Sequence, residues 1–368
     1  MEGEPGDAGV RVYLAESNPR HLLAARHMTV RMKMLCSFHY YRDTDMDDLI
    51  AAFPTHPEVF GDSGAFSAMS VGAAIDVHEY GRWLQRWQHL LHVYVGLDVI
   101  GDPVASEENQ RVLEDQYGLR PVPVFHGGEP WEYLHAYCAR YPYVALGGMV
   151  SSAGPAAILR WLTHSFKIGE EYGTRFHGFG QTRIEVLKSI PFYSVDSSSW
   201  GSGHRYGQVH LWDDRRARWV RIKTGTRDAL AHPQLVRAHG GDPVALSTPG
   251  FAQVGDSGKG VEQARDERAQ IIAVNVAAWL LLERWLHRRH GYVSAPEGYT
   301  MGDGTRVYLA DARGTRGHVT ENPDLAIAEE QLDAGVRVYL ADAATGGTNV
   351  PFHTLAEHLH GQAVEEQP

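Results

Sequence analysis

The chain has 368 residues, of which 43% are hydrophobic and 21% charged, and its formal net charge is −11. A chain of this length and apolar content can bury a large core, and its negative charge argues against a protein that coats nucleic acid nonspecifically. No run of eighteen apolar residues occurs, so we expect no membrane-spanning helix and no membrane partner, and residues 1–9 are acidic and Gly-rich, unlike a signal peptide.

Short apolar runs rich in β-branched and aromatic residues recur through the first 200 residues, with helical periodicity between most of them. Eight runs read as strands: Val10–Glu16, Met32–Tyr40, Val59–Gly64, Val93–Val99, Val122–His126, Tyr143–Gly148, Arg175–Gly180 and Phe192–Ser197. The helical stretches are Asp76–Leu91, Glu107–Tyr117, Trp131–Ala139, Pro155–Phe166 and Thr182–Ser189. Strands that alternate with helices predict a parallel sheet, and eight such units predict an α/β fold of the (β/α)8 TIM-barrel type. An open doubly wound sheet is the alternative, because it shows the same alternation.

The two cysteines, Cys36 and Cys138, lie inside these apolar runs. This placement predicts buried, reduced thiols and a reducing, cytoplasmic compartment. The cysteines are too far apart for a Cys-x-x-Cys zinc site, so we expect no metal and no cofactor. Because the chain has 21 histidines, a metal site built from histidine side chains stays an alternative.

Residues 201–260 are rich in Gly, Pro and His and contain a predicted hairpin, with His210–Trp212 before the turn and a basic run after it. The basic residues of this hairpin are Arg215, Arg216, Arg218, Arg221 and Lys223. They indicate either a ribbon that grips the phosphates of a nucleic acid or an ordinary solvated hairpin, and both interpretations stay open.

A long helix is predicted over 262–290, ending at Gly291, and we expect it to close the barrel as its last helix. The expected domains are therefore a barrel over residues 10–295, with 201–260 inserted, and a C-terminal extension over 296–368. Residues Asp7–Ala15 recur unchanged as Asp333–Ala341, and Arg306–Ala310 is a shorter copy. These copies either pair as an extra sheet, form a small appended module, or are a duplication that has no structural role in a loosely packed tail.

Three acids come at the ends of predicted strands: Asp62, Asp98 and Asp196. Barrel enzymes build their active sites at the C-terminal ends of their strands, so these acids are candidates for chemistry. Small hydroxyl residues, Ser197–Ser199, follow Asp196 and could orient it by hydrogen bonds. A single acid at a strand end is a structural cap as often as it is a catalytic group. The hypothesis of an active site therefore depends on all three acids together.

Six motifs in order along the chain resemble those of the tRNA-guanine transglycosylases. They are Asp62–Phe66 for Asp-Ser-Gly-Gly-Phe/Tyr, Gly96–Asp98 for the base-reading aspartate strand, 124–128 for Val-Gln-Gly-Gly, 145–149 for Gly-Gly-Leu-Ala, His177–Gly180 for Met-Gly-Val-Gly, and Val195–Asp196 for the Phe-Asp of the nucleophile. The chain most resembles the DNA-directed members of the DpdA type, which occur in bacterial modification clusters and phages. For a phage-encoded chain, the expected compartment is the cytoplasm of the bacterial host.

The resemblance implies a role for each matching residue. Asp196 would be the nucleophile that forms a covalent ester with the sugar, and Asp62 the general acid and base. Asp98 would read the guanine edge, because a carboxylate accepts from both N1–H and the exocyclic amine. Phe66 would stack on the base. The remaining residues implied in substrate binding are Ser63, His126, Gly147, Gly148 and His177.

The chain also departs from that family. No cysteine follows Cys138, so the family's Cys-x-Cys-x-x-Cys zinc site is absent. His126 stands where the family has Gln, and His177 where it has a stacking Met, and both changes fall in the base pocket.

The function that follows is replacement of guanine in DNA by a 7-deazaguanine, such as 7-cyano-7-deazaguanine, by a pentosyltransferase. The alternatives are the same exchange in tRNA, a non-catalytic nucleic-acid-binding accessory subunit, and a barrel hydrolase that uses paired carboxylates on a nucleoside or sugar. Whether the chain forms a homodimer stays open.

Overall fold

A computed structural model describes residues 10–16, 18, 21, 23, 31–148, 154–201, 203, 206–253, 260–291, 293 and 296, together with the strands at 306–310, 316–317 and 337–341. Eight parallel strands form its main sheet, in the order β4-β3-β2-β1-β8-β7-β6-β5. They are β1 (Arg11–Ala15), β2 (Lys33–Ser37), β3 (Glu58–Asp62), β4 (Val93–Tyr94), β5 (Val124–His126), β6 (Tyr143–Gly147), β7 (Arg175–Gly178) and β8 (Ser194–Ser197).

The sheet closes on itself next to β4 and β5. A parallel bridge joins Val95 to Val122. The Val122 N–H donates to the Tyr94 carbonyl and the Gly96 N–H to the Val122 carbonyl, both at 2.9 Å. An open doubly wound sheet would leave these two strands as free edges, so the TIM-barrel prediction is confirmed.

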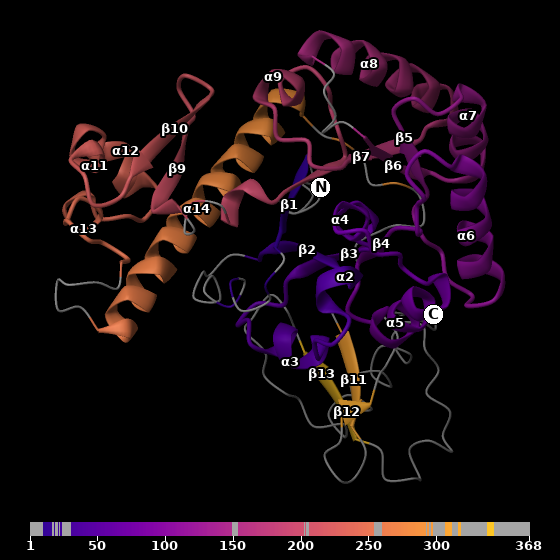
Figure 1. The fold of residues 1–368 in the computed structure, drawn as a ribbon, viewed down its shortest axis with the longest axis horizontal. Coiled ribbons are helices and arrows are strands. Elements are labelled where there is room, and N and C mark those ends of the chain that lie inside the picture. Colours follow the sequence, from indigo (N-terminus) through magenta and orange to yellow (C-terminus); the bar gives the residue numbers. More distant parts are fainter. Residues whose placement is uncertain are drawn as a thin grey trace, which may run out of the picture.

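Helices surround the barrel between the strands (Figure 1). They are α2 (Phe38–Tyr41), α3 (Met46–Ala51), α4 (Ala65–Ser70), α5 (Val77–Trp87), α6 (Pro103–Asp115), α7 (Trp131–Arg140), α8 (Pro155–Tyr172) and α9 (Ile184–Leu187). The five predicted helices are all present. α6 starts four residues before its predicted start, because Asp102 caps it by accepting from the Ala105 N–H at 3.0 Å, and Pro103 begins its first turn.

Strand side chains alternate between the barrel interior and the helices. The interior cluster consists of Tyr13, Leu35, Phe60, Val93, Val95, Val122, Val124, Tyr143, Ala145 and Tyr193. The intervening residues, such as Val12, Met34, Val59 and Val144, belong to the core shared with the helices. Because this period is two, Asp62 lies on the inward face with Phe60. In β8, which begins after Tyr193, Asp196 lies on the same face as Ser194, whose Oγ contacts Tyr143 in the interior.

The region after the barrel strands forms a small lobe with its own core. After the short turn η1 (Ser199–Gly201), β9 (Gln208–Asp213) and β10 (Arg218–Lys223) pair antiparallel, which confirms the predicted hairpin. The lobe continues with α11 (Asp228–Ala231), α12 (Pro233–Ala238) and α13 (Pro243–Leu246). It lies on the far side of the long helix α14 from the barrel, at the left of Figure 1.

Helix α14 (Val261–His290) ends at Gly291, as predicted, and its two halves pack differently. Ile271 and Val274, in its first half, belong to the lobe core. In its second half, Glu283 accepts from the Val12 N–H at 2.7 Å and from Lys33 Nζ at 2.8 Å, which ties the helix to β1 and β2. α14 therefore serves as the last helix of the barrel.

By length and composition alone, α14 is also apolar enough to cross a membrane, which the sequence did not lead us to expect. Of its most apolar window, 56% is buried inside the protein, and the core helix of a globular protein meets the same criteria.

The repeated segments of the tail pair with each other. β11 (Arg306–Ala310) lies between β12 (Arg316–Gly317) and β13 (Arg337–Ala341) in an antiparallel sheet, with Tyr308 opposite Tyr339. This is the extra sheet that the repeats suggested. The domain boundary at residue 295 stays a prediction. Cys36 and Cys138 are buried and unpaired, as expected.

Replacing Glu283 by Ala should lower the free energy of unfolding by about 3 kcal/mol, because it leaves the Lys33 ammonium and the Val12 N–H without their partner in a mostly buried place. Denaturant unfolding measures this. Glu262→Ala, at an exposed position on the same helix, is the matched control and should change little. Equal losses in the two variants would show that α14 is not anchored through Glu283.

Candidate active site

The three acids singled out from the sequence gather at one end of the barrel. Asp62 is the last residue of β3, Asp196 lies in β8, and Asp98 follows β4 by four residues. Parallel strands present their carboxyl ends at the same rim, which brings these side chains together. The charges of Asp98 and Asp196 both help to raise the pKa of Asp62, so the three acids share one electrostatic environment.

Among the described residues, hydrogen bonds reach only one of the two oxygens of Asp62. Its Oδ2 accepts from Ser37 Oγ at 2.6 Å and from the Gly64 N–H at 3.1 Å. Burial, followed by the two neighbouring acids, raises the pKa of Asp62 to about 6. Gly64 has φ +76°, and a Cβ there would lie 2.6 Å from the His39 Cβ, so the turn after Asp62 requires glycine. The site therefore contains a carboxyl group that titrates near neutral pH.

Asp98 is held by two side chains. Ser63 Oγ donates to its Oδ1 at 3.4 Å, and His126 Nε2 lies 3.2 Å from its Oδ2. Burial raises the pKa of Asp98 to about 6. Ser63 is fully buried, and its Oγ also accepts from the Ala65 N–H at 3.1 Å. The Asp62–Phe66 motif thus supplies both an acid and a support for a second acid.

His126 contacts a second carboxylate, Glu129, which we did not single out in the sequence. Its Nδ1 lies 3.5 Å from Glu129 Oε1, and its backbone N–H donates to Glu129 Oε2 at 2.9 Å. Burial lowers the pKa of His126 and raises that of Glu129. The available signal is the spacing His126-Gly-Gly-Glu129, in which two glycines let the chain turn back on itself.

The predicted glycines Gly147 and Gly148 have specific places. A Cβ on Gly147 would lie 2.4 Å from His126 Cδ2, so this glycine makes room for the His126 ring. Gly148 has φ +76°, a conformation that favours glycine. Whether either backbone also contacts a base stays a prediction.

Asp196 has a different environment from the other two acids. It is 7% exposed, its Oδ1 accepts from the Gly180 N–H at 2.6 Å, and His177 Nε2 lies 3.5 Å from the same oxygen. Within the described part of the chain, nothing bonds to its Oδ2. The Ser197 hydroxyl, which we expected to orient Asp196, instead accepts from the Ser199 N–H at 3.0 Å. The backbone N–H of Gly180, rather than the Ser197 hydroxyl, therefore orients the Asp196 carboxylate.

His177 is completely buried between aromatic rings. Its ring centre lies 4.5 Å from that of Phe60 and 4.6 Å from that of Phe179. Its Nδ1 is 2.6 Å from Ser194 Oγ, which is 2.5 Å from the Tyr143 hydroxyl. The structure gives His177 a contact to Asp196, while direct contact with a base stays a prediction.

The remaining predicted residues lie at the rim or beyond it. Phe66, on α4, is 60% exposed, and its stacking on a base stays a prediction. The basic residues of the hairpin are exposed but sit in the separate lobe. Arg216 pairs with Asp213 at 3.0 Å, and Arg218 reaches the same carboxylate at 4.0 Å. The structure therefore does not bring this hairpin into the site.

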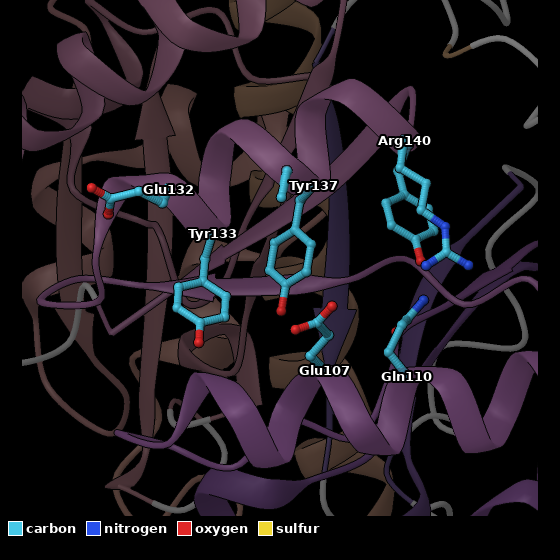
Figure 2. Close-up of a pocket in the computed structure, with 8 residues that line it drawn as sticks. Glu107, Gln110, Glu132, Tyr133, Tyr137 and Arg140 are labelled. Carbon is cyan, nitrogen blue, oxygen red and sulfur yellow. The ribbon is translucent and has the colours of Figure 1, made fainter.

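A cavity of about 380 Å³ lies outside the barrel, between α6 and α7 (Figure 2). Tyr133 and Tyr137 point from α7 toward Glu107 and Gln110 on α6. Gln110 and Tyr137 also line a space of about 10 Å³ next to Asp98, which is enough for about one water. The larger cavity is thus behind Asp98 rather than at the barrel mouth. Among the residues that the structure describes, no group of three or more His, Cys, Asp or Glu could hold a metal.

Comparisons with known proteins identify no family. No protein-family model matches the chain, and no curated protein matches it significantly. Solved structures similar to it include one described as a fructose-1,6-biphosphate aldolase from Coccidioides immitis, with a TM-score of 0.45 and 10% identity over 76% of this chain and 92% of that one. A citrate synthase variant has a TM-score of 0.31 and 11% identity, over 54% and 90%. The carboxyl transferase domain of pyruvate carboxylase from Rhizobium etli has a TM-score of 0.37 and 12% identity, over 73% and 48%. These likenesses are distant, and the barrel assignment rests on the strand pairing itself.

Asp62→Asn should stabilise the protein at pH 7.5 by about 1–2 kcal/mol and have no such effect near pH 4. A carboxyl whose folded pKa of about 6 lies above its unfolded value contributes its stability at low pH and loses it as the pH rises through 6. The amide cannot ionise, so the variant avoids this loss. Urea unfolding of both proteins between pH 4 and 7.5 measures it. A difference that is the same at every pH would show that Asp62 is not destabilised by ionisation.

Proposed function

We propose that the chain is a base-exchange transglycosylase that replaces guanine in DNA with a 7-deazaguanine. The observation that carries this proposal is the pair Asp62 and Asp196. The pKa of Asp62 is raised to about 6, whereas Asp196 has one oxygen held by the Gly180 N–H and no hydrogen bond to the other from any described residue. Two carboxyls with such different environments suit one acid–base group and one nucleophile. The six motifs support the same assignment from the sequence.

In the first step, Asp196 Oδ2 would attack C1′ of the target nucleotide. The C1′–N9 bond breaks, its electron pair leaves with guanine, and an ester forms between the sugar and Asp196. The Gly180 N–H and the His177 ring stay on Oδ1, so they orient the carboxylate without blocking the attacking oxygen. A carboxylate nucleophile of this kind divides one difficult substitution into two easier ones.

Asp62 would move the protons that this exchange requires. The leaving guanine takes up a proton as the C–N bond breaks, and the incoming base loses one as the new bond forms. A group with a pKa of about 6 can donate and then accept near neutral pH. Oδ1 is the atom available for this, because Ser37 and Gly64 occupy Oδ2 and no residue in the described ranges bonds to Oδ1.

Asp98 and His126 would line the side of the pocket that recognises the base. An ionised Asp98 accepts from N1–H and the exocyclic amine, which guanine and its 7-deaza analogues have in common. Ser63 and His126 face different oxygens of Asp98, so neither partner occupies both atoms that would meet the base. Phe66 is placed to cover the base from the rim.

Asp196→Asn should abolish exchange of labelled guanine into DNA while the circular dichroism spectrum stays unchanged. Asp62→Asn should slow exchange by about 10²–10⁴-fold, as expected for loss of a general acid–base group. Asp48→Asn, at an exposed position on α3, is the matched control and should exchange normally. Exchange at the wild-type rate in Asp196→Asn would remove the nucleophile assignment. Release of base without replacement would favour the hydrolase, and no reaction with any polymer would favour the accessory subunit.

We favour DNA as the polymer, and the hairpin as its phosphate contact. Arg221 and Lys223 are exposed, and neither is paired within the described structure. A target guanine must leave the stack to reach a barrel mouth, so single-stranded or mismatched guanine should react faster than paired guanine.

The double variant Arg221→Glu with Lys223→Glu should bind DNA more weakly, with a shallower dependence of log Kd on log salt. Fluorescence anisotropy at several salt concentrations measures this. Arg237→Glu, on α12 of the same lobe, makes a smaller charge change and controls for nonspecific effects. An unchanged salt slope in the double variant would mean an ordinary solvated hairpin. Exchange into tRNA and into no form of DNA would replace DNA by tRNA in the proposal.

A further inference from the structure

We propose that Asp98, His126 and Glu129 form a proton relay, through which Asp98 passes its proton to Glu129 rather than to solvent when a base binds. The proposal rests on the proposed function, because it concerns how the base-reading acid becomes ionised. Neither the motifs nor the comparisons assign a role to Glu129.

The three groups lie in one line of contacts. Asp98 Oδ2 is 3.2 Å from His126 Nε2, and His126 Nδ1 is 3.5 Å from Glu129 Oε1. His126 Nδ1 and Glu129 Oε1 are both buried, and neither has a hydrogen-bond partner among the described residues. Each atom therefore faces the other with its hydrogen-bonding capacity unused, and a small approach of the two would join them for a proton transfer.

The imidazole ring is fixed in this line from three sides. Glu129 Oε2 accepts from the His126 backbone N–H at 2.9 Å, which holds the carboxylate over the residue. Asp98 meets the ring at its other nitrogen, and Gly147 leaves only enough room for the ring where it lies. A ring held in this way keeps one nitrogen toward each carboxyl group.

The relay neither gains nor loses a proton when the base binds. Before a base binds, burial favours a neutral Asp98, and His126 carries its proton on Nδ1 facing an ionised Glu129. On binding, the Asp98 proton moves to His126 Nε2, and the Nδ1 proton moves to Glu129 Oε1. The triad has one negative charge before and after, and that charge moves from Glu129 to Asp98, where the N–H groups of the base meet it.

Burial favours the neutral form of all three groups of the relay. It raises the pKa of both Asp98 and Glu129, and it lowers that of His126. A neutral imidazole has one N–H and one lone pair, so it can take a proton at one nitrogen and release one at the other.

Other titratable groups face the triad. Asp62 on β3 interacts with Asp98, Tyr80 on α5 faces Asp98 and Asp62, and Tyr137 on α7 faces Glu129 and Asp98. Burial raises the pKa values of both tyrosines, so they stay neutral near pH 6. Asp62 has a pKa of about 6, so it would also titrate near the pH of the experiment. Every variant that is compared therefore keeps Asp62.

Calorimetry of base binding tests the relay. 7-Cyano-7-deazaguanine is titrated at pH 6 into wild type and Glu129→Gln, in two buffers of different ionisation enthalpy. Wild type should bind with close to no net proton release, and Glu129→Gln should release up to about one proton, because its amide cannot take up the proton of Asp98. Affinity in the variant should fall as the pH is lowered below 6, and more steeply than in wild type. The amide oxygen can still accept from the His126 N–H, so the turn is preserved, and His164→Gln on α8 is a control for an unrelated histidine.

Equal proton release by wild type and Glu129→Gln would overturn the relay. If the base binds neither protein, the proposed function fails, and the relay is tested separately by ¹⁵N NMR of the His126 ring in the free protein. The relay predicts that the proton in wild type favours Nδ1 and that Glu129→Gln shifts it toward Nε2. A ring whose tautomer does not respond to Glu129→Gln would contradict the relay without reference to any substrate.

Discussion

Closure of the parallel sheet is the constraint on which the rest of this structure depends. The hydrogen bonds between Val122 and the Tyr94–Gly96 segment join the last free edges. Once all eight strands run in one direction around a closed ring, their carboxyl ends meet at one mouth. Asp62 and Asp196 lie far apart in the sequence and come together for this reason alone. Helix α14 stabilises the barrel at β1 through the Val12–Glu283 hydrogen bond. β1 pairs with β8, and Tyr13 of β1 lies opposite Asp196.

Burial at that mouth raises the pKa of Asp62 and of Asp98, and each of the three acids has its own set of supporting groups. A hydroxyl and a backbone N–H support Asp62, a buried histidine and Ser63 support Asp98, and the Gly180 N–H and a second buried histidine face Asp196. The two histidines are supported from behind by different partners. A carboxylate lies behind His126, whereas neutral hydroxyls lie behind His177. The two histidines at the mouth therefore differ in whether an acid or a neutral hydroxyl faces their second nitrogen.

Much of the fold could be predicted from the sequence, because strand and helix patterns are local. The eight strands, the hairpin and the long helix follow from apolar periodicity and turn residues, and Gly291 marks the end of α14 as expected. The strand-end acids could also be predicted, since their position depends only on where each strand ends. The extension of α8 to Tyr172 was missed, because its polar second half weakens the periodic pattern.

The supports of the acids could not be predicted, because they depend on which strands become neighbours. Ser37 meets Asp62 only because β2 pairs with β3, and Gly180 meets Asp196 only because β7 pairs with β8. Glu129 is close in sequence to His126, yet its importance appears only when Asp98 is found on the other side of the ring.

If Asp196 is the nucleophile, it forms a covalent bond with the sugar during exchange. The most direct measurement is mass spectrometry of the protein after rapid quenching with a guanine-containing oligonucleotide, followed by mapping of the modified peptide. We expect an added mass on the peptide that contains Asp196, lost in Asp196→Asn. A sugar adduct on another residue, or exchange that proceeds without any adduct, would contradict the assignment.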